Sequence, residues 1–238
     1  GKKPKVKPEI KVTKNKDGTQ TLEKVDKRPS ISIWVHTPAR SEALIWLIKT
    51  YNRQKKFDQA ASVVTYVRND DMFYKNFDPQ LELVEADLLV SKKDYAGAIV
   101  PLEKYLNAKK IKKKKKLRVR PLFVLAQCYQ MIGNKTKAIE NFRLVLKSRP
   151  NYDMEFYAKL KMAKLARGNI NDNKAIKSLL VSMAKDKKYS DYWDQVYYEL
   201  ALISISENNR PVARAFLHKS VNFSTTNDDQ LALSYLNL

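Results

Sequence analysis

The side chains that carry most enzymatic chemistry are sparse in this sequence of 238 residues. Its two histidines, His36 and His218, lie far apart, and the chain has no HExxH or CxxC motif and no other metal-ligand spacing. The five glycines are scattered, so they cannot build a phosphate-binding loop. We therefore expect a chain that is not an enzyme, with no catalytic residues, no metal site and no cofactor.

The single cysteine, Cys128, excludes an intrachain disulfide and leaves the cellular compartment open. It stands beside Tyr129 on a predicted helix, and no histidine or other activating group is near it in the sequence. We expect a small packed side chain rather than a reactive thiol.

Basic side chains are the abundant chemical groups, and the formal net charge is +21. Residues 1–30 hold ten basic residues against four acids, whereas residues 104–120 hold ten basic residues and no acid. The second run either binds phosphates or an anionic surface, or is a solvated helix extension that keeps the protein soluble. No aromatic residue lies between Lys112 and Arg120, which weighs against stacking on nucleic-acid bases. The polyanion alternative uses Lys112, Lys113, Lys114, Lys115, Lys116 and Arg118.

The elements that position these groups are predicted by a long repeat. Five alanines recur at separations of 38, 40, 37 and 38 residues, and an apolar residue follows each of them four positions later. A second, mostly small position repeats in phase, twelve residues before each alanine. This period predicts a stacked array of helical repeats, and such arrays usually present binding surfaces. The alanines are Ala60, Ala98, Ala138, Ala175 and Ala213, and the earlier positions are Ile48, Ala86, Ala126, Ala163 and Ala201.

The third copy, residues 119–152, has the clearest pattern. One apolar face runs through Leu122, Leu125, Ala126 and Tyr129, a turn follows at Gly133 and Asn134, and a second face carries Ala138, Phe142 and Val145 before Pro150. These residues resemble a tetratricopeptide repeat, a helix pair whose small residues allow close packing. The resemblance covers residues 41 to about 224 with a partial copy after them, although the fourth and fifth copies lack the tyrosine.

The resemblance implies an all-α, right-handed superhelical solenoid of antiparallel helix pairs. We expect an N-terminal arm and cap in residues 1–40, five helix pairs in residues 41–224, and the first helix of a truncated further repeat in residues 225–238. Apolar residues on both sides of an Asp17-Gly18 turn predict a β-hairpin in the arm, with a disordered linker as the alternative. The Gly1 start and the unfinished last repeat suggest a piece of a longer protein.

In a tetratricopeptide-like array the first helix of each pair lines the inner face. Cations and aromatic residues alternate along this predicted face, which would suit an extended peptide or a helix with apolar anchors. The alternative is that curvature of the array buries the apolar members. Related chaperone-binding proteins clamp a peptide carboxylate with Lys, Asn and Arg on successive first helices. In this sequence the equivalent positions hold Ile45, Leu83 and Phe123, so we do not expect that mode of binding. We call the candidate partner-binding residues on this face the inner stripe: Lys49, Asn52, Arg120, Phe123, Gln127, Tyr157, Lys164, Arg167 and Tyr198.

A second resemblance is narrower. The chain resembles the tetratricopeptide lipoproteins of Bacteroidetes gliding motility and type IX secretion in three features. These are a lysine-rich N-terminal segment, the stretch HTPARSEALIWLIKTYNRQKKFDQA and a second repeat that is lengthened by lysines. This resemblance implies a periplasmic scaffold, anchored to the outer membrane by a lipidated cysteine upstream of Gly1, that bridges components of the secretion machine. The sequence itself carries no signal peptide and no apolar run of about 18 residues.

Overall fold

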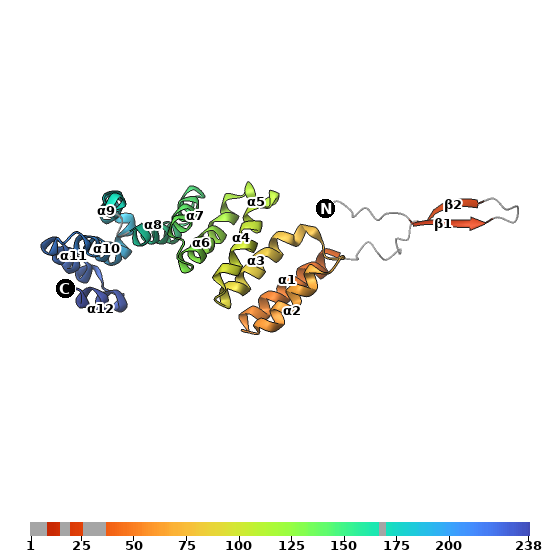
Figure 1. The fold of residues 1–238 in the computed structure, drawn as a ribbon, viewed down its shortest axis with the longest axis horizontal. Coiled ribbons are helices and arrows are strands. Elements are labelled where there is room, and N and C mark those ends of the chain that lie inside the picture. Colours follow the sequence, from red (N-terminus) through yellow and green to blue (C-terminus); the bar gives the residue numbers. More distant parts are fainter. Residues whose placement is uncertain (1–8, 15–19, 26–36, 167–169) are drawn as a thin grey trace.

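The computed structural model describes residues 9–14, 20–25, 37–166 and 170–238. Within these residues, five helix pairs and one further helix follow one another in chain order, as the solenoid prediction requires (Figure 1). The pairs are α1 (Thr37–Arg53) with α2 (Phe57–Arg68), α3 (Asp78–Ser91) with α4 (Tyr95–Asn107), α6 (Lys115–Met131) with α7 (Lys135–Lys147), α8 (Tyr152–Ala166) with α9 (Ile170–Lys185), and α10 (Trp193–Ser206) with α11 (Arg210–Phe223), and the further helix is α12 (Asp228–Leu236).

The expected hairpin is present in the N-terminal region. Strands β1 (Glu9–Lys14) and β2 (Gln20–Val25) pair antiparallel, with Glu9 opposite Val25 and Lys14 opposite Gln20. The predicted Asp17-Gly18 turn and the predicted cap before the first repeat lie outside the described residues. Helix α1 already begins at Thr37, four residues before the expected start of the first repeat.

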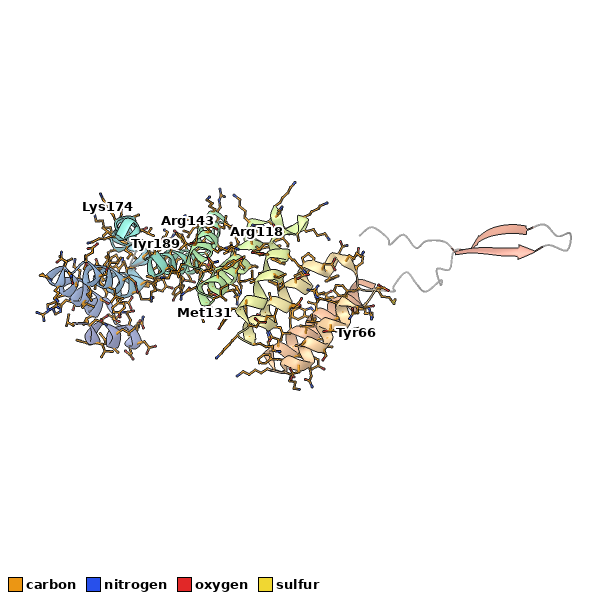
Figure 2. The ribbon with its side chains drawn as sticks, in the orientation of Figure 1. Tyr66, Arg118, Met131, Arg143, Lys174 and Tyr189 are labelled. Carbon is orange, nitrogen blue, oxygen red and sulfur yellow. The ribbon has the colours of Figure 1, made fainter. Side chains whose placement is uncertain are left out.

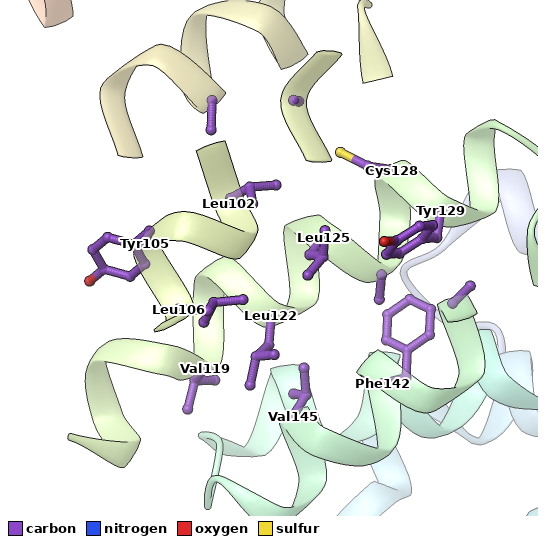
Figure 3. Close-up of a cluster of buried hydrophobic side chains, with 14 of the residues drawn as sticks. Leu102, Tyr105, Leu106, Val119, Leu122, Leu125, Cys128, Tyr129, Phe142 and Val145 are labelled. Atoms are coloured by element: carbon purple, nitrogen blue, oxygen red, sulfur yellow. The ribbon is translucent and has the colours of Figure 1, made fainter. Parts of the chain in front are cut away.

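The core is distributed along the stack, as in repeat arrays. Three successive clusters of buried side chains run from α1 to α3, from α3 to α8 and from α8 to α10 among the described residues. In the middle cluster, Leu122, Leu125 and Tyr129 of α6 meet Phe142 and Val145 of α7 (Figure 3). The second repeating position is buried on every first helix, and four of its five residues are alanines, whose small side chains permit close helix approach. The residues, each at most 2% exposed, are Ile48, Ala86, Ala126, Ala163 and Ala201.

The alanine register fails in the fourth pair. Ala60, Ala98, Ala138 and Ala213 are buried, but Ala175 is exposed. Helix α9 instead buries Ile176, Leu180 and Met183, one position later in the sequence. One position turns a helix face by about 100°. Burying an isoleucine and a leucine removes more apolar surface from water than burying an alanine would, so the larger side chains determine which face packs.

The turns inside four of the pairs share one conformation. Lys55, Lys93, Gly133 and Asn208 each have a φ between 57° and 80°, and each lies two residues after the end of a first helix. The backbone N–H of the residue after each of these turns donates to a carbonyl in the last turn of the first helix. Asn134 N, for example, donates to Tyr129 O at 2.9 Å. In three of the turns the side chain of that next residue also caps the second helix: Asp94, Asn134 and Asn209.

The 40-residue spacing corresponds to an inserted short helix, α5 (Lys109–Lys112), which is held by the buried Ile111. Helix α6 then begins inside the lysine run at Lys115. Two 3-10 segments, η2 (Lys75–Phe77) and η3 (Lys187–Tyr192), precede α3 and α10. None of the helices in the described residues is both long and apolar enough to cross a membrane.

Helix α12 docks through hydrogen-bonding side chains. Ser220 of α11 donates to the backbone oxygen of Asp194 at 2.6 Å, and its hydroxyl lies 2.8 Å from the hydroxyl of Ser234 on α12. Gln230 Nε2 lies 3.3 Å from the same Ser234 oxygen, and Asn227 Nδ2 donates to Asp194 Oδ2 at 3.0 Å. We call this group the polar seam; Asp194, Ser220, Gln230 and Ser234 are buried, and Asn227 is half-buried.

Candidate protein-binding face

The inner stripe lies on α1, α6, α8 and α10, and its members differ in exposure. Arg120 and Lys164 are exposed, and Tyr157 is 37% exposed. Lys49, Phe123, Gln127 and Tyr198 are half-buried, whereas Asn52 is buried. Arg167 lies outside the described residues. The stripe therefore offers both accessible cations and partly covered rings.

Several stripe residues connect neighbouring helices within the array. Asn52 Nδ2 donates to Asp87 Oδ2 of α3 at 2.6 Å, although its buried Oδ1 has no partner among the described residues. Lys164 Nζ lies 3.3 Å from Glu199 Oε1 of α10. Asn237 Nδ2 donates to the hydroxyl of Tyr198 at 3.3 Å. These polar groups stabilise the stack, which limits what they offer a partner.

The aromatic members of the stripe are held by other rings. Phe123 packs edge-to-face on Phe142, with 5.3 Å between ring centroids. Tyr157 packs in the same way against Phe156 and Tyr192. Because these contacts fix the rings, a partner would meet preorganised apolar anchors.

Two pockets open along α6. The Lys161 pocket, of about 250 Å³, lies at the C-terminal half of α6 and contains the predicted residue Gln127. Burial, together with the charge of Lys164, lowers the pKa of Lys161 on α8. Lys161 has no hydrogen bond or ion pair in the part of the chain that the structure describes. The pocket is lined by Val90, Tyr95, Val124, Gln127, Cys128, Gln130, Met131 and Lys161.

The second pocket, which we call the basic pocket, has a volume of about 400 Å³ and lies at the N-terminal half of α6. Lys116 and Arg120 stand one helical turn apart, and Arg149 joins them from the loop between α7 and α8. These three side chains make no ion pair or hydrogen bond with the other described residues. The remaining lining residues are Val119, Pro150, Asn151 and Met154.

The lysine run is solvent-facing. The side chains of residues 112–116 are exposed, and none of them pairs with an acid among the described residues. Arg118 differs, because it is half-buried and donates to the backbone oxygen of Leu106 at 2.7 Å (Figure 2). Arg118 therefore also joins α4 to α6, and its role in the polyanion alternative stays a prediction.

Cys128 is packed, as expected. It is 1% exposed, and burial raises the pKa of its thiol to about 11, so the nucleophilic thiolate is scarce at neutral pH. His218 is exposed on α11. The residues that the structure describes contain no group of three or more His, Cys, Asp or Glu side chains that could hold a metal ion.

Sequence reasoning missed Lys161 and Arg149. Lys161 lies four residues after Tyr157 on α8, beside the stripe, so helix spacing offered a signal for it that the prediction did not use. Arg149 lies in a loop 29 positions after Arg120, and only the folded stack brings these two residues to one pocket. The available signal for Arg149 was Pro150, which marks where a second helix ends and the chain turns back.

No protein-family model and no curated protein matches this chain. Solved structures with a similar fold include YrrB, described as a TPR protein with an unusual peptide-binding site, at 14% identity, with 85% of this chain and 98% of YrrB covered and a TM-score of 0.60. A structure described as MamA AMB-1 is similar at 14% identity over 82% and 98% of the two chains, with a TM-score of 0.58. The fold is therefore a tetratricopeptide-like all-α solenoid.

Proposed function

We propose that the chain is a non-catalytic scaffold that binds a protein partner along α6 and α8. One observation carries the proposal: unpaired cations line two pockets at the two ends of α6, beside the partly exposed rings of Phe123 and Tyr157. Binding sites for peptides combine apolar anchors with a few placed polar groups. YrrB, whose description names a peptide-binding site, has a similar fold, which supports this kind of role.

The scaffold proposal is tested by pull-down from envelope and cytosolic extracts with the wild-type protein and two matched variants. Tyr157→Ala removes an anchor from the proposed face, whereas Tyr235→Ala removes a ring that is 59% exposed on α12. We expect a captured partner to bind the Tyr157 variant about tenfold more weakly, because partly buried aromatic anchors dominate interfaces. A partner that is insensitive to Tyr157→Ala, or equally sensitive to both variants, would contradict this face.

We further propose that the scaffold belongs to a bacterial envelope machine of the gliding or type IX secretion kind, as a periplasmic protein anchored to the outer membrane. The support is the resemblance of the lysine-rich lead and first repeat to lipoproteins of that machine. Fractionation of the source cells should place the full-length protein in the outer membrane, facing the periplasm, and cross-linking should capture secretion components. Recovery from the cytosol would exclude this role.

Polyanion or nucleic-acid binding through residues 1–30 and 104–120 is the second candidate. The exposed, unpaired lysines at 112–116 favour it. Replacement of all five by Gln should abolish retention on heparin and flatten the dependence of binding on salt, because released counterions drive such binding. Unchanged retention of the variant would rule this candidate out.

A further inference from the structure

The two pockets belong to one surface. Helices α6 and α8 contact each other. Each pocket draws residues from both helices: Arg120 and Met154 line the basic pocket, while Gln127 and Lys161 line the Lys161 pocket. Phe123 lies between Arg120 and Gln127 on α6. A chain that bridged the pockets would therefore cross an apolar ring.

The cations of this surface have no acidic partner among the described residues: Lys116, Arg120 and Arg149 are exposed, and Lys161 is half-buried. Lys116, Arg120 and Arg149 surround one pocket whose lining contains no acid, and the charge of Lys164 acts on Lys161 in the other. Like charges brought together repel, and a partly desolvated cation is costly without a partner. An incoming carboxylate would offset both costs and would form charge-assisted hydrogen bonds, which are stronger than neutral ones.

The spacing between the pockets limits what can bind. Arg120 to Gln127 is seven positions on α6, and Met154 to Lys161 is seven positions on α8. At about 1.5 Å per helical residue, the pockets are on the order of 10 Å apart. An extended peptide advances about 3.3 Å per residue, so about three residues span that distance.

The linings distinguish between classes of partner. The basic pocket has Val119, Pro150 and Met154 as its apolar wall and no aromatic side chain on which a base could stack. Single-stranded nucleic acid depends on such stacking, whereas an acidic peptide uses aliphatic walls beside cations. The combination of cations and aliphatic side chains favours a protein segment.

We propose that α6 and α8 bind an extended acidic segment of a partner protein, with two carboxylates about three residues apart and an apolar residue between them. One carboxylate pairs with Lys116, Arg120 and Arg149, the other pairs with Lys161, and the apolar residue lies against Phe123. This inference rests on the proposed scaffold function and gives its partner a chemistry.

The test is selection from a displayed library of short random peptides, followed by fluorescence anisotropy with the most enriched peptide. We expect the enriched sequences to share two acids about three positions apart that flank an apolar residue. Moving one acid by a single position, or replacing either acid by its amide, should weaken binding by about tenfold. Enrichment of sequences without paired acids would overturn the inference, and so would a library that enriches nothing.

Two pocket variants have matched controls on neighbouring helices. Arg149→Gln and Lys161→Gln should each bind the peptide about tenfold more weakly, while Arg143→Gln on α7 and Lys174→Gln on α9, both exposed, should bind within about threefold of wild type (Figure 2). All four replacements keep a polar side chain, and circular dichroism checks that each variant folds. Pocket variants that bind like their controls would overturn the inference.

Charge reversal separates a direct contact from an indirect one. Lys161→Glu should bind poorly to the acidic peptide and recover binding to a peptide in which the facing acid is replaced by Lys. Tight competition by an oligodeoxynucleotide that is lost in Arg149→Gln would reassign the basic pocket to nucleic acid and overturn the inference. Enriched peptides that depend on Tyr157 but not on Arg149 or Lys161 would leave the scaffold proposal standing and remove only the acidic partner.

Discussion

Glu155 on α8 is a residue whose protonation is tied to the fold. Lys159 Nζ and the Tyr189 hydroxyl donate to its Oε1 at 2.8 and 2.7 Å, and Lys188 Nζ donates to its Oε2 at 2.6 Å. Burial alone would raise the pKa of Glu155, but these three hydrogen bonds outweigh burial and lower the pKa to about 2. One carboxylate thus joins α8 to the η3 segment before α10.

Acid should therefore weaken the fourth and fifth pairs first. A carboxyl whose pKa is lower in the folded state than in the unfolded state contributes stability above its unfolded pKa, and that stability is lost as the pH falls through the folded value. We expect the free energy of unfolding to fall by about 1–2 kcal/mol between about pH 5 and pH 2, after allowing for partial solvent exposure. Urea unfolding at several pH values measures the change, and the Glu155→Gln variant should lack it.

The alanine register predicts the buried face of a second helix wherever that register also buries the most apolar surface. This condition holds for α2, α4, α7 and α11, whose alanines are buried, and fails for α9, where Ile176 and Leu180 replace Ala175 and Leu179 at the core. The second repeating position on the first helices could be predicted, because it keeps phase with the alanines in all five copies and is buried in each. The two pockets could not be predicted from the sequence, because Arg149 and Lys161 reach them only when separate helix pairs pack together.

Two alanine substitutions test the packing registers directly. Ala138→Leu forces extra volume into a site that is 0% exposed and should destabilise the protein by about 1–3 kcal/mol. Ala175→Leu places the same side chain on the exposed face of α9 and should change stability by less than about 0.5 kcal/mol. Urea midpoints compare the two variants. Equal loss of stability in both would contradict the register of α9.

The shared turn gives a second prediction for the elements. Lys93 adopts a φ of 63°, a conformation that glycine enters without steric cost and other residues do not. Lys93→Gly should stabilise the α3–α4 pair by about 0.5–1 kcal/mol. Gly133→Ala should destabilise by about 1 kcal/mol, because Gly133 has a φ of 80° although space for a methyl group is open. Thermal unfolding of both variants should give shifts of opposite sign.

The whole molecule is a chain of neighbours, because each helix pair packs mainly on the pairs before and after it. A destabilising substitution in one helix pair should therefore affect mainly that pair and its neighbours. Phe142→Ala opens a cavity at a site that is 0% exposed and should cost about 3–5 kcal/mol. Hydrogen exchange should show α6, α7 and α8 losing protection while α1 and α2 keep theirs. A uniform loss in all helices would show that the array unfolds as one unit.

The polar seam gives the last interface of the array a selectivity that apolar packing lacks. Apolar surfaces pack against many apolar neighbours, whereas Ser220 and Asp194 are buried and make directional hydrogen bonds to Ser234 and Asn227. A helix without the hydroxyl of Ser234 or the amide of Asn227 would lose one hydrogen bond to Ser220 or Asp194, at a cost of about 0.5–1.5 kcal/mol each, while Ser220 would keep its bond to the backbone oxygen of Asp194. The polar seam thus favours α12 at this end of the stack over a helix that lacks hydrogen-bonding side chains at the matching positions.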